Sequence, residues 1–236
     1  MMNEIKKFGL VSKSDTGGRE APSAEVMAAI NALTLRPLAP EEVFTFRVAA
    51  CDDQIDRDFE RFSEAALAEM EELYVGKSML FDHAWSGHNQ TARVFASAVE
   101  KNGEVSRLVL SAYMLRGAAA DDTIAAIEGG ILKEVSVAVS VPEALCSVCG
   151  TDWRKAWCEH VKGVAYGGEV CCAILNHVTD VYELSFVAVP AQRSAGVIKA
   201  YGGEENRPAS PPPEDDSAAK RALALLELEE QTIKNL

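Results

Sequence analysis

The middle of the chain contains several strand-length segments in which apolar residues alternate with small or polar ones. Three such segments are EEVFTFRVAA (41–50), TARVFASAVEKNGEVSRLVLSAYML (91–115) and KEVSVAVSV (133–141). A period of two over these lengths is typical of half-buried β-strands. Because few helices separate the strands, a doubly wound parallel sheet is disfavoured. We therefore predict a mixed α+β fold with a mostly antiparallel β-barrel core and a few surrounding helices.

Capping and turn residues indicate where these elements begin and end. Ser63 is a good N-cap for a helix whose apolar residues recur at three- and four-residue spacing, namely Leu67, Met70, Leu73 and Tyr74. The dipeptide Asn102-Gly103 favours a tight hairpin between two strands. Asp121 or Asp122 is expected to cap a second short helix, and Gly129 or Gly130 to end it.

Composition shifts divide the chain into several parts. Residues 1–40 are expected to be peripheral, and 41–200 to form the β-rich domain. A cysteine-rich insertion at 142–177 interrupts the strands of that domain. Residues 201–217 form a linker rich in Gly, Pro and acidic residues, with too few apolar side chains to fold. A Leu-rich helix is predicted at 218–236.

Charge and hydrophobicity exclude several classes of protein. The 236 residues carry a formal net charge of −13, whereas a nucleic-acid-binding protein needs a cationic surface. The apolar runs are strand-length, far below the roughly 20 residues that span a bilayer. The N-terminus lacks the apolar stretch of a signal peptide. We expect an acidic, intracellular protein that binds neither membranes nor nucleic acid.

Five of the six cysteines lie in the insertion. Four residues give the spacing Cys-x2-Cys-x8-Cys-x-His, with Gly150 in the first turn: Cys146, Cys149, Cys158 and His160. In a reducing compartment clustered thiols indicate metal ligands before disulfides. Three thiolates and one imidazole suit tetrahedral Zn²⁺ and leave no open position for chemistry. We predict a structural zinc site, the alternative being buried cysteines without a ligand.

The remaining cysteines and histidine of the insertion have no clear assignment. Cys171, Cys172 and His177 could replace or supplement a zinc ligand, but such residues are more often small buried side chains. We assign them no role.

Serine nucleophiles need a base within hydrogen-bonding distance, and usually a third group that orients the base. His83 follows an apolar strand-like segment and is a candidate base, whereas His88 lies in a Gly/Asn loop. Ser136 shares one face of a valine-rich strand with Ser140, and Glu183 lies in another strand. By themselves, these residues are most simply interpreted as the polar face of half-buried strands.

Five short motifs, in order, resemble the prohead (capsid maturation) proteases of tailed bacteriophages, whose fold is similar to the herpesvirus assemblin proteases. The resemblance spans about residues 42–200, and its motifs are CDDQIDRDFERFSEAALAEM, MLFDHAW, QTARVF, IEGGILKEVSVAV and YELSFVAVPAQ. The resemblance implies that Ser136 is the nucleophile, His83 the general base and Glu183 the residue that orients it. Where the family has glycine two residues after the serine, this chain has Ala138.

The resemblance leaves parts of the site open. If the insertion displaced Glu183, Asp82 could take its role, or no third residue would act. Backbone N–H groups would stabilise the oxyanion, with Arg93 or Arg116 as candidate helpers.

The implied function is serine endopeptidase activity on capsid and scaffolding proteins, and on the chain itself, by an acyl-enzyme mechanism. The implied location is the host cytoplasm, inside the assembling prohead, and a homo-oligomer stays open. The main alternative is an inactive assembly protein that keeps the protease-like core and a structural zinc. A third interpretation, a zinc-knuckle adaptor for nucleic acid or protein, would use Trp153, Arg154, Lys155 and Trp157.

Overall fold

The structure, a computed structural model, describes residues 21–198. In chain order, its helices and strands are α1 (Ala24–Asn31), the 3-10 helix η1 (Pro40–Glu42), β1 (Val43–Asp52), β2 (Glu60–Phe62), α2 (Glu64–Leu73), β3 (Ser78–Phe81), the 3-10 helix η2 (Gly87–Asn89), β4 (Ala92–Asn102), β5 (Val105–Leu115), α3 (Asp121–Glu128), β6 (Val135–Ser140), β7 (Glu143–Cys146), β8 (Ala165–Tyr166), β9 (Glu169–Val170), β10 (Ala173–Asn176), β11 (Asp180–Phe186) and β12 (Gly196–Ile198). The predicted linker at 201–217 and the predicted helix at 218–236 lie outside the described residues.

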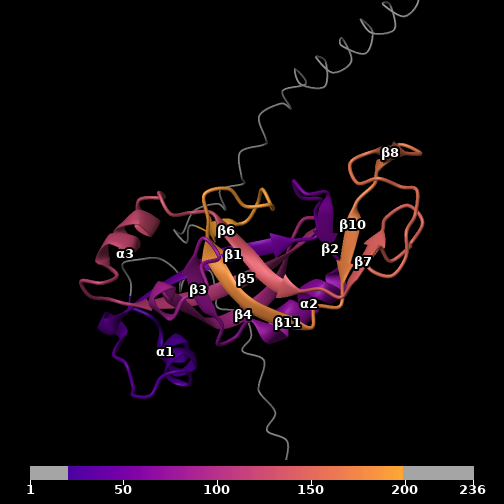
Figure 1. Cartoon of the computed structure of the whole chain (residues 1–236). Helices are drawn as coiled ribbons and strands as arrows, with labels where there is room; N and C mark the ends of the chain where they lie inside the picture. The colour runs from indigo at the N-terminus through magenta and orange to yellow at the C-terminus, as the bar shows by residue number, and fades with distance from the viewer. Residues whose placement is uncertain (1–20, 199–236) are drawn as a thin grey trace, which may run out of the picture. The chain divides into compact units, whose positions relative to one another are not determined.

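Seven of these strands form one curved sheet, in the order β12-β1-β5-β4-β3-β11-β6. All neighbouring pairs are antiparallel except β3 and β11, which are parallel. The sheet curls into a half-barrel (Figure 1), and an isolated bridge joins Glu134, before β6, to Gly196 of β12. The mixed α+β class and the mostly antiparallel β-core are thus confirmed. The finer similarity to herpesvirus proteases stays a prediction.

The core of this sheet follows from the alternating pattern of its strands. Phe44, Phe46 and Val48 of β1 point into one buried cluster. Helix α2 packs on the same cluster and contacts β4, β5 and β11; its buried residues include Leu67 and Met70. Each large apolar side chain so buried contributes about 1.5–3 kcal/mol relative to exposure.

Most of the predicted element ends are confirmed, and one cap is wrong. Ser63 caps α2, accepting a hydrogen bond from the N–H of Ala66 at 3.1 Å. Gly103 has φ 65° in the turn between β4 and β5, and Gly130 has φ 72° after α3. However, neither Asp121 nor Asp122 is the N-cap of α3, because both lie inside its first turn.

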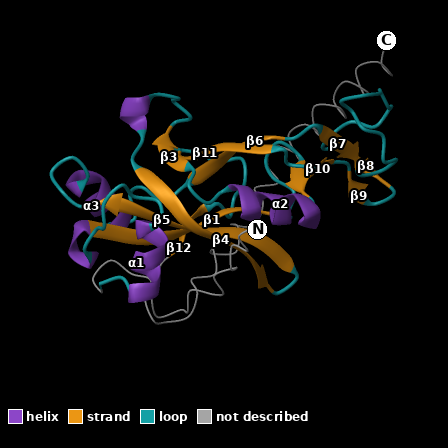
Figure 2. Ribbon diagram, turned by 90° about the horizontal axis from the view of Figure 1, so that it is seen from below, coloured by secondary structure: helices purple, strands orange, loops and turns teal. Residues whose placement is uncertain are grey.

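The cysteine-rich segment forms a smaller unit at one end of the main sheet. Strands β2, β10 and β7 make a three-stranded sheet, and β8 and β9 make a short hairpin. Figure 1 places β7, β8 and β10 beyond β2, and Figures 1 and 2 both place them on the side away from α1 and α3. The insertion therefore contacts the rest of the chain mainly through β2 and the residues around it.

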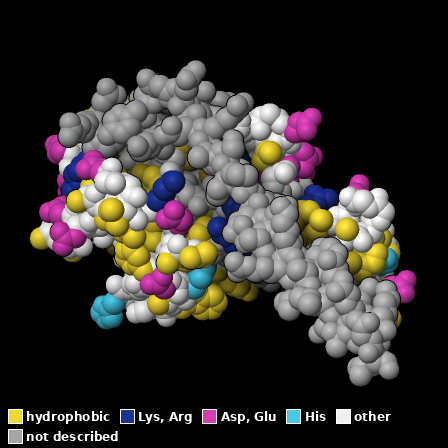
Figure 3. Space-filling model, turned by 90° about the horizontal axis from the view of Figure 1, so that it is seen from above, with side chains coloured by type: hydrophobic (Ala, Val, Ile, Leu, Met, Phe, Trp, Pro, Cys, Tyr) yellow, Lys and Arg dark blue, Asp and Glu magenta, His cyan; other side chains and the backbone are white. Residues whose placement is uncertain are grey.

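No helix among residues 21–198 is long and apolar enough to cross a membrane. The face seen in Figure 3 has a broad area of apolar side chains with acidic and basic groups around it.

Candidate active site and metal centre

His83 is carried by a sharp turn at the end of β3. Asp82 and His83 both have positive φ, 54° and 52°, a conformation that is uncommon for residues other than glycine. The turn is fixed at its start, where the N–H of Asp82 donates to the carbonyl of Phe186 at 2.9 Å. Because β3 runs beside β11, the turn brings the imidazole back over β11.

Glu183 of β11 is the residue that contacts this imidazole. His83 Nδ1 and Glu183 Oε1 are 2.6 Å apart, and the carboxylate is only 3% exposed. Its other oxygen, Oε2, accepts a hydrogen bond from Ser185 Oγ at 2.6 Å. Glu183 is therefore a buried carboxylate with two side-chain partners and not a solvent-exposed one. Asp82, the alternative partner, is exposed.

A β-bulge determines which way Glu183 points. Val181 and Glu183 pair with consecutive residues of β6, so Tyr182 between them has no partner. Side chains alternate between the two faces of a strand, and one extra residue shifts that alternation. Val181 can therefore stay in the apolar core while Glu183 lies on the face of the sheet that Ser136 occupies.

Ser136 lies directly opposite Ser185 in the pairing of β6 with β11, and cross-strand partners have their side chains on the same face. Ser136 is partly exposed and lines a cavity of about 460 Å³. Its Oγ makes no hydrogen bond to the His83 ring or to any other residue of the described part. Such contacts are often long before substrate binds.

The cavity beside Ser136 has an aromatic side and a loop side. Trp85 and Tyr182 line it, with ring centroids 5.4 Å apart and exposures of 68% and 47%. Ala191 and Gln192 line it from the loop after β11, and their backbone N–H groups donate to no other residue within 21–198. These two N–H groups are therefore candidate donors to an oxyanion.

The two arginines suggested as oxyanion helpers do not line this cavity. Arg93 donates to the carbonyl of Gly76 at 2.7 Å. Arg116 donates to the carbonyl of Val43 and lies over the ring of Phe44. Both arginines contact the frame of the sheet, and the structure does not bring either of them to this cavity.

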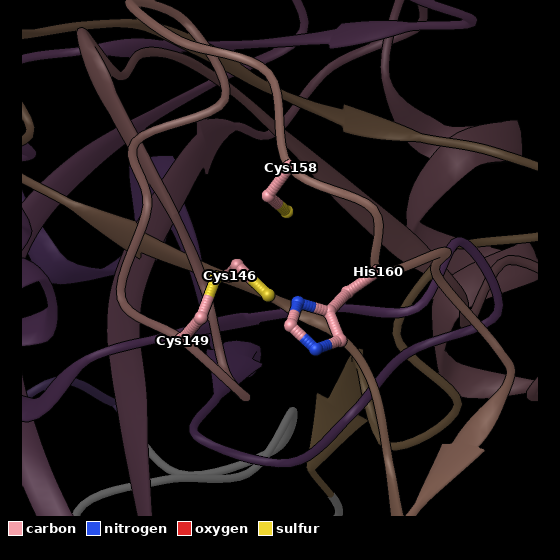
Figure 4. Close-up of side chains that lie close together, drawn as sticks. All are labelled: Cys146, Cys149, Cys158 and His160. Atoms are coloured by element: carbon pink, nitrogen blue, oxygen red, sulfur yellow. The ribbon is translucent and has the colours of Figure 1, made fainter.

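The second cluster contains the four predicted metal ligands. The donor atoms of Cys146, Cys149, Cys158 and His160 all lie within 4.8 Å of one another, and Figure 4 shows the three sulfurs and one ring nitrogen converging. Gly150, with φ 73°, makes the turn after the first two cysteines. A tetrahedral Zn²⁺ with bonds of about 2.3 Å would place its sulfur ligands about 3.8 Å apart. Small side-chain shifts would therefore suffice to bind an ion.

Polar groups at the cluster support a metal ligand set. His160 Nδ1 is buried and has no hydrogen-bond partner in the part of the chain that is described, a state that coordination would satisfy. Trp153 Nε1 donates to Cys158 Sγ at 2.8 Å, as outer partners of metal-bound thiolates do. Hydrogen bonds with Thr151 lower the pKa of Cys149 to about 6, which favours the thiolate that binds metal.

The unassigned residues of the insertion lie outside this ligand set. Cys171 is buried with its Sγ 3.9 Å from Cys146 Sγ, and Cys172 is buried as well. His177 lies between Glu69 and Glu143, at 3.6 and 3.8 Å. The structure gives these three residues no place among the four clustered ligands.

Ser185 is a functional candidate that the sequence did not single out. Its Oγ is fully buried, donates to Glu183 and accepts the N–H of His83 at 3.0 Å. It thus ties the carboxylate and the histidine backbone together. The available signal was the Glu-x-Ser spacing, because residues two apart on a strand share one face.

Replacing Ser185 with alanine is expected to lower kcat about 10- to 100-fold with little change in KM. The buried Oε2 of Glu183 loses its donor, and misplacing a catalytic group by about 1 Å can cost 10²-fold. The assay uses a peptide spanning a cleavage site mapped with the wild type. The control is Ser111→Ala, which removes a buried serine of β5. Equal kcat values for both variants and the wild type would contradict this role.

Comparisons with protein-family models, with curated proteins and with solved structures found no match to this chain.

Proposed function

We propose that this protein is a serine endopeptidase in which Ser136 is the nucleophile, His83 the general base and Glu183 the group that orients the base. The observation that carries the proposal is the 2.6 Å contact of His83 Nδ1 with the buried Glu183, on the face of the sheet where Ser136 lines a cavity. Nucleophile, base and orienting acid are the parts that acyl transfer needs.

The contact supports one direction of proton transfer. A hydrogen bond from Nδ1–H to Glu183 leaves Nε2 of His83 free to accept the Ser136 proton. Ser136 Oγ attacks the peptide carbonyl carbon, and the negative charge on the oxygen is stabilised by the N–H groups of Ala191 and Gln192. His83 then gives the proton to the leaving amine as the C–N bond breaks. Water releases the acyl group by the reverse use of the same base.

The proposed substrates are capsid and scaffolding polypeptides inside an assembling phage prohead, and the chain itself. Support for this setting is the order of the five motifs that resemble prohead proteases. The alternative is an inactive assembly protein with the same core. The absence of a hydrogen bond from Ser136 Oγ to the imidazole is the observation that favours it.

The metal in the proposed protein is a structural Zn²⁺ held by the four clustered ligands. Three thiolates and an imidazole are a zinc ligand set, and four protein ligands leave no position for substrate. The ion would hold the insertion together and take no part in bond cleavage.

Diisopropyl fluorophosphate, which phosphorylates activated serines, tests the assignment directly. We expect the intact mass of the wild type to increase by one adduct, located on Ser136 by peptide mapping, because His83 activates only that hydroxyl. The matched variants are Ser136→Ala, which should stay unlabelled, and Ser140→Ala, on the same face of β6, which should be labelled like the wild type. Incubation with the capsid and scaffolding proteins of the same virus should produce fragments with the wild type and Ser140→Ala, but not with Ser136→Ala.

An unlabelled wild type with intact substrates in every condition would overturn the endopeptidase proposal. The inactive assembly protein would then be the better interpretation.

A further inference from the structure

The metal cluster and the cavity beside Ser136 are built on the same small sheet. Cys146, the first ligand, ends β7 and pairs with Ala173 of β10. Strand β10 pairs in turn with β2, and Glu60 and Phe62 of β2 line the cavity. Three adjacent strands therefore connect a metal ligand to the cavity wall.

Residues of the insertion also contact the segment 56–62 directly. Lys162 Nζ forms an ion pair with Glu60 Oε1 at 2.7 Å. The N–H of Ala173 donates to the carbonyl of Phe59 at 2.9 Å. Gly163 lies against the ring of Phe59 so closely that an added Cβ would lie 2.9 Å from it. All three contacts are made by residues that follow the last metal ligand, His160, along the chain.

Phe59 is the position in this segment where the backbone depends on its surroundings. It has φ 54°, and its ring is 41% exposed. A bulky residue in the left-handed region is strained, by about 1–3 kcal/mol, and persists only where its surroundings hold it. Here the surroundings are a local turn, in which the carbonyl of Asp56 accepts the N–H of Phe59 at 3.3 Å, together with Gly163 and Ala173 of the insertion.

The insertion also reaches the cavity itself. Arg154 lies between the second and third metal ligands and lines the same cavity as Ser136. Its backbone is fixed by Asp152, which accepts the N–H of Arg154 at 3.0 Å. The neighbouring Trp153 is bonded to the ligand Cys158. Arg154, which lines the cavity, is therefore adjacent in sequence to Trp153, whose side chain contacts the metal cluster.

We propose that the metal-binding insertion is one wall of the substrate cleft, and that an ion on its four ligands holds this wall in place. Extended polypeptide bound beside Ser136 contacts Arg154 and the segment 56–62. Loss of the metal releases this wall while His83 and Glu183 keep their contact. The proposal rests on the proposed function where it names the cavity a substrate cleft, but the coupling between metal and wall can be measured without turnover.

Hydrogen exchange read by mass spectrometry on the full zinc-loaded chain tests the coupling. On removal of zinc with a chelator, we expect amide exchange to become at least about tenfold faster both in the insertion and in peptides covering 56–62. Peptides from the turn between β4 and β5 should not change. Faster exchange in the insertion with an unchanged 56–62 segment would overturn the proposal.

Two glycine variants test the same link with the metal still bound. Gly163→Ala places a methyl group against Phe59, whereas Gly167→Ala meets nothing within 4 Å, and both positions have positive φ, 84° and 63°. Since the backbone strain is shared, the variants differ mainly in the contact with Phe59. We expect about tenfold faster exchange at 56–62 in Gly163→Ala than in Gly167→Ala. Equal exchange in the two variants would contradict the proposal. Because both variants are measured with zinc bound, this test also works if the chain unfolds globally on chelation.

The proposed endopeptidase function and the proposed metal-held wall can be contradicted independently of each other. Labelling of Ser136 by diisopropyl fluorophosphate is measured in the same samples. A wild type that stays unlabelled contradicts the endopeptidase function, while coupled exchange in that sample still supports the metal-held wall.

Discussion

Replacing Glu183 with glutamine is expected to lower kcat for peptide cleavage about 10⁴-fold. An amide in place of the carboxylate can present its NH₂ to His83 Nδ1, which favours the tautomer with the proton on Nε2. The proposed nucleophile, Ser136, would then have no base to accept its proton. It also removes the charge that stabilises the imidazolium during the reaction. Because Glu183 is 3% exposed and does not line the cavity, KM should change little. The measurement is kcat and KM with a peptide spanning a mapped cleavage site.

Asp82→Asn is the matched control for this change. Asp82 is adjacent to His83 and exposed, and asparagine tolerates the positive φ of this position. Its kcat should stay within a few-fold of the wild type. A large loss with Asp82→Asn and a small loss with Glu183→Gln would exchange the roles of the two carboxylates.

The strand pattern predicted most of the fold because burial and sequence period agree there. Phe44, Phe46 and Val48 alternate with less buried residues in β1 as the sequence indicates. The prediction of the N-cap of α3 was wrong for a local reason. The Asp121 carboxylate accepts the N–H of Gly117 at 3.3 Å from inside the helix, so an acidic residue near a helix start did not have to be its N-cap.

The candidate site depended on contacts between strands that no single segment encodes. The bulge at Tyr182 determines the face on which Glu183 lies, yet nothing in the local sequence marks a bulge there. Ser185 gains its role only because β3 pairs with β11 and brings the backbone of His83 to it. The predicted metal ligands were easier to identify, since they lie close together in the sequence as well as in space. Residues that cluster within one short segment could therefore be predicted from the sequence, whereas the pairing register of β11 could not.

Removal of the metal is expected to have the largest effect on stability. The insertion has few buried apolar residues to hold it, and Val148, Trp157, Val161 and Val164 are exposed. An ion that binds only the folded state adds about 4 kcal/mol when its free concentration is a thousandfold above its dissociation constant. For a chain of this size 1 kcal/mol shifts the melting temperature by about 2–4 °C. We therefore expect the Tm measured by calorimetry to fall by about 8–16 °C on chelation.

Cys149→Ser isolates the contribution of the ligand set. Cys149 is exposed, so the change removes a thiolate without opening a cavity. The variant should bind no zinc by native mass spectrometry, melt like the chelated wild type and show no further fall with chelator. Val148→Ser, next to it and also exposed at 40%, should keep both the zinc and the Tm. If Cys149→Ser instead kept its Tm and the wild type did not respond to chelator, the insertion would be held by its hydrogen bonds and the small sheet alone. The cysteine cluster would then have no structural metal to hold.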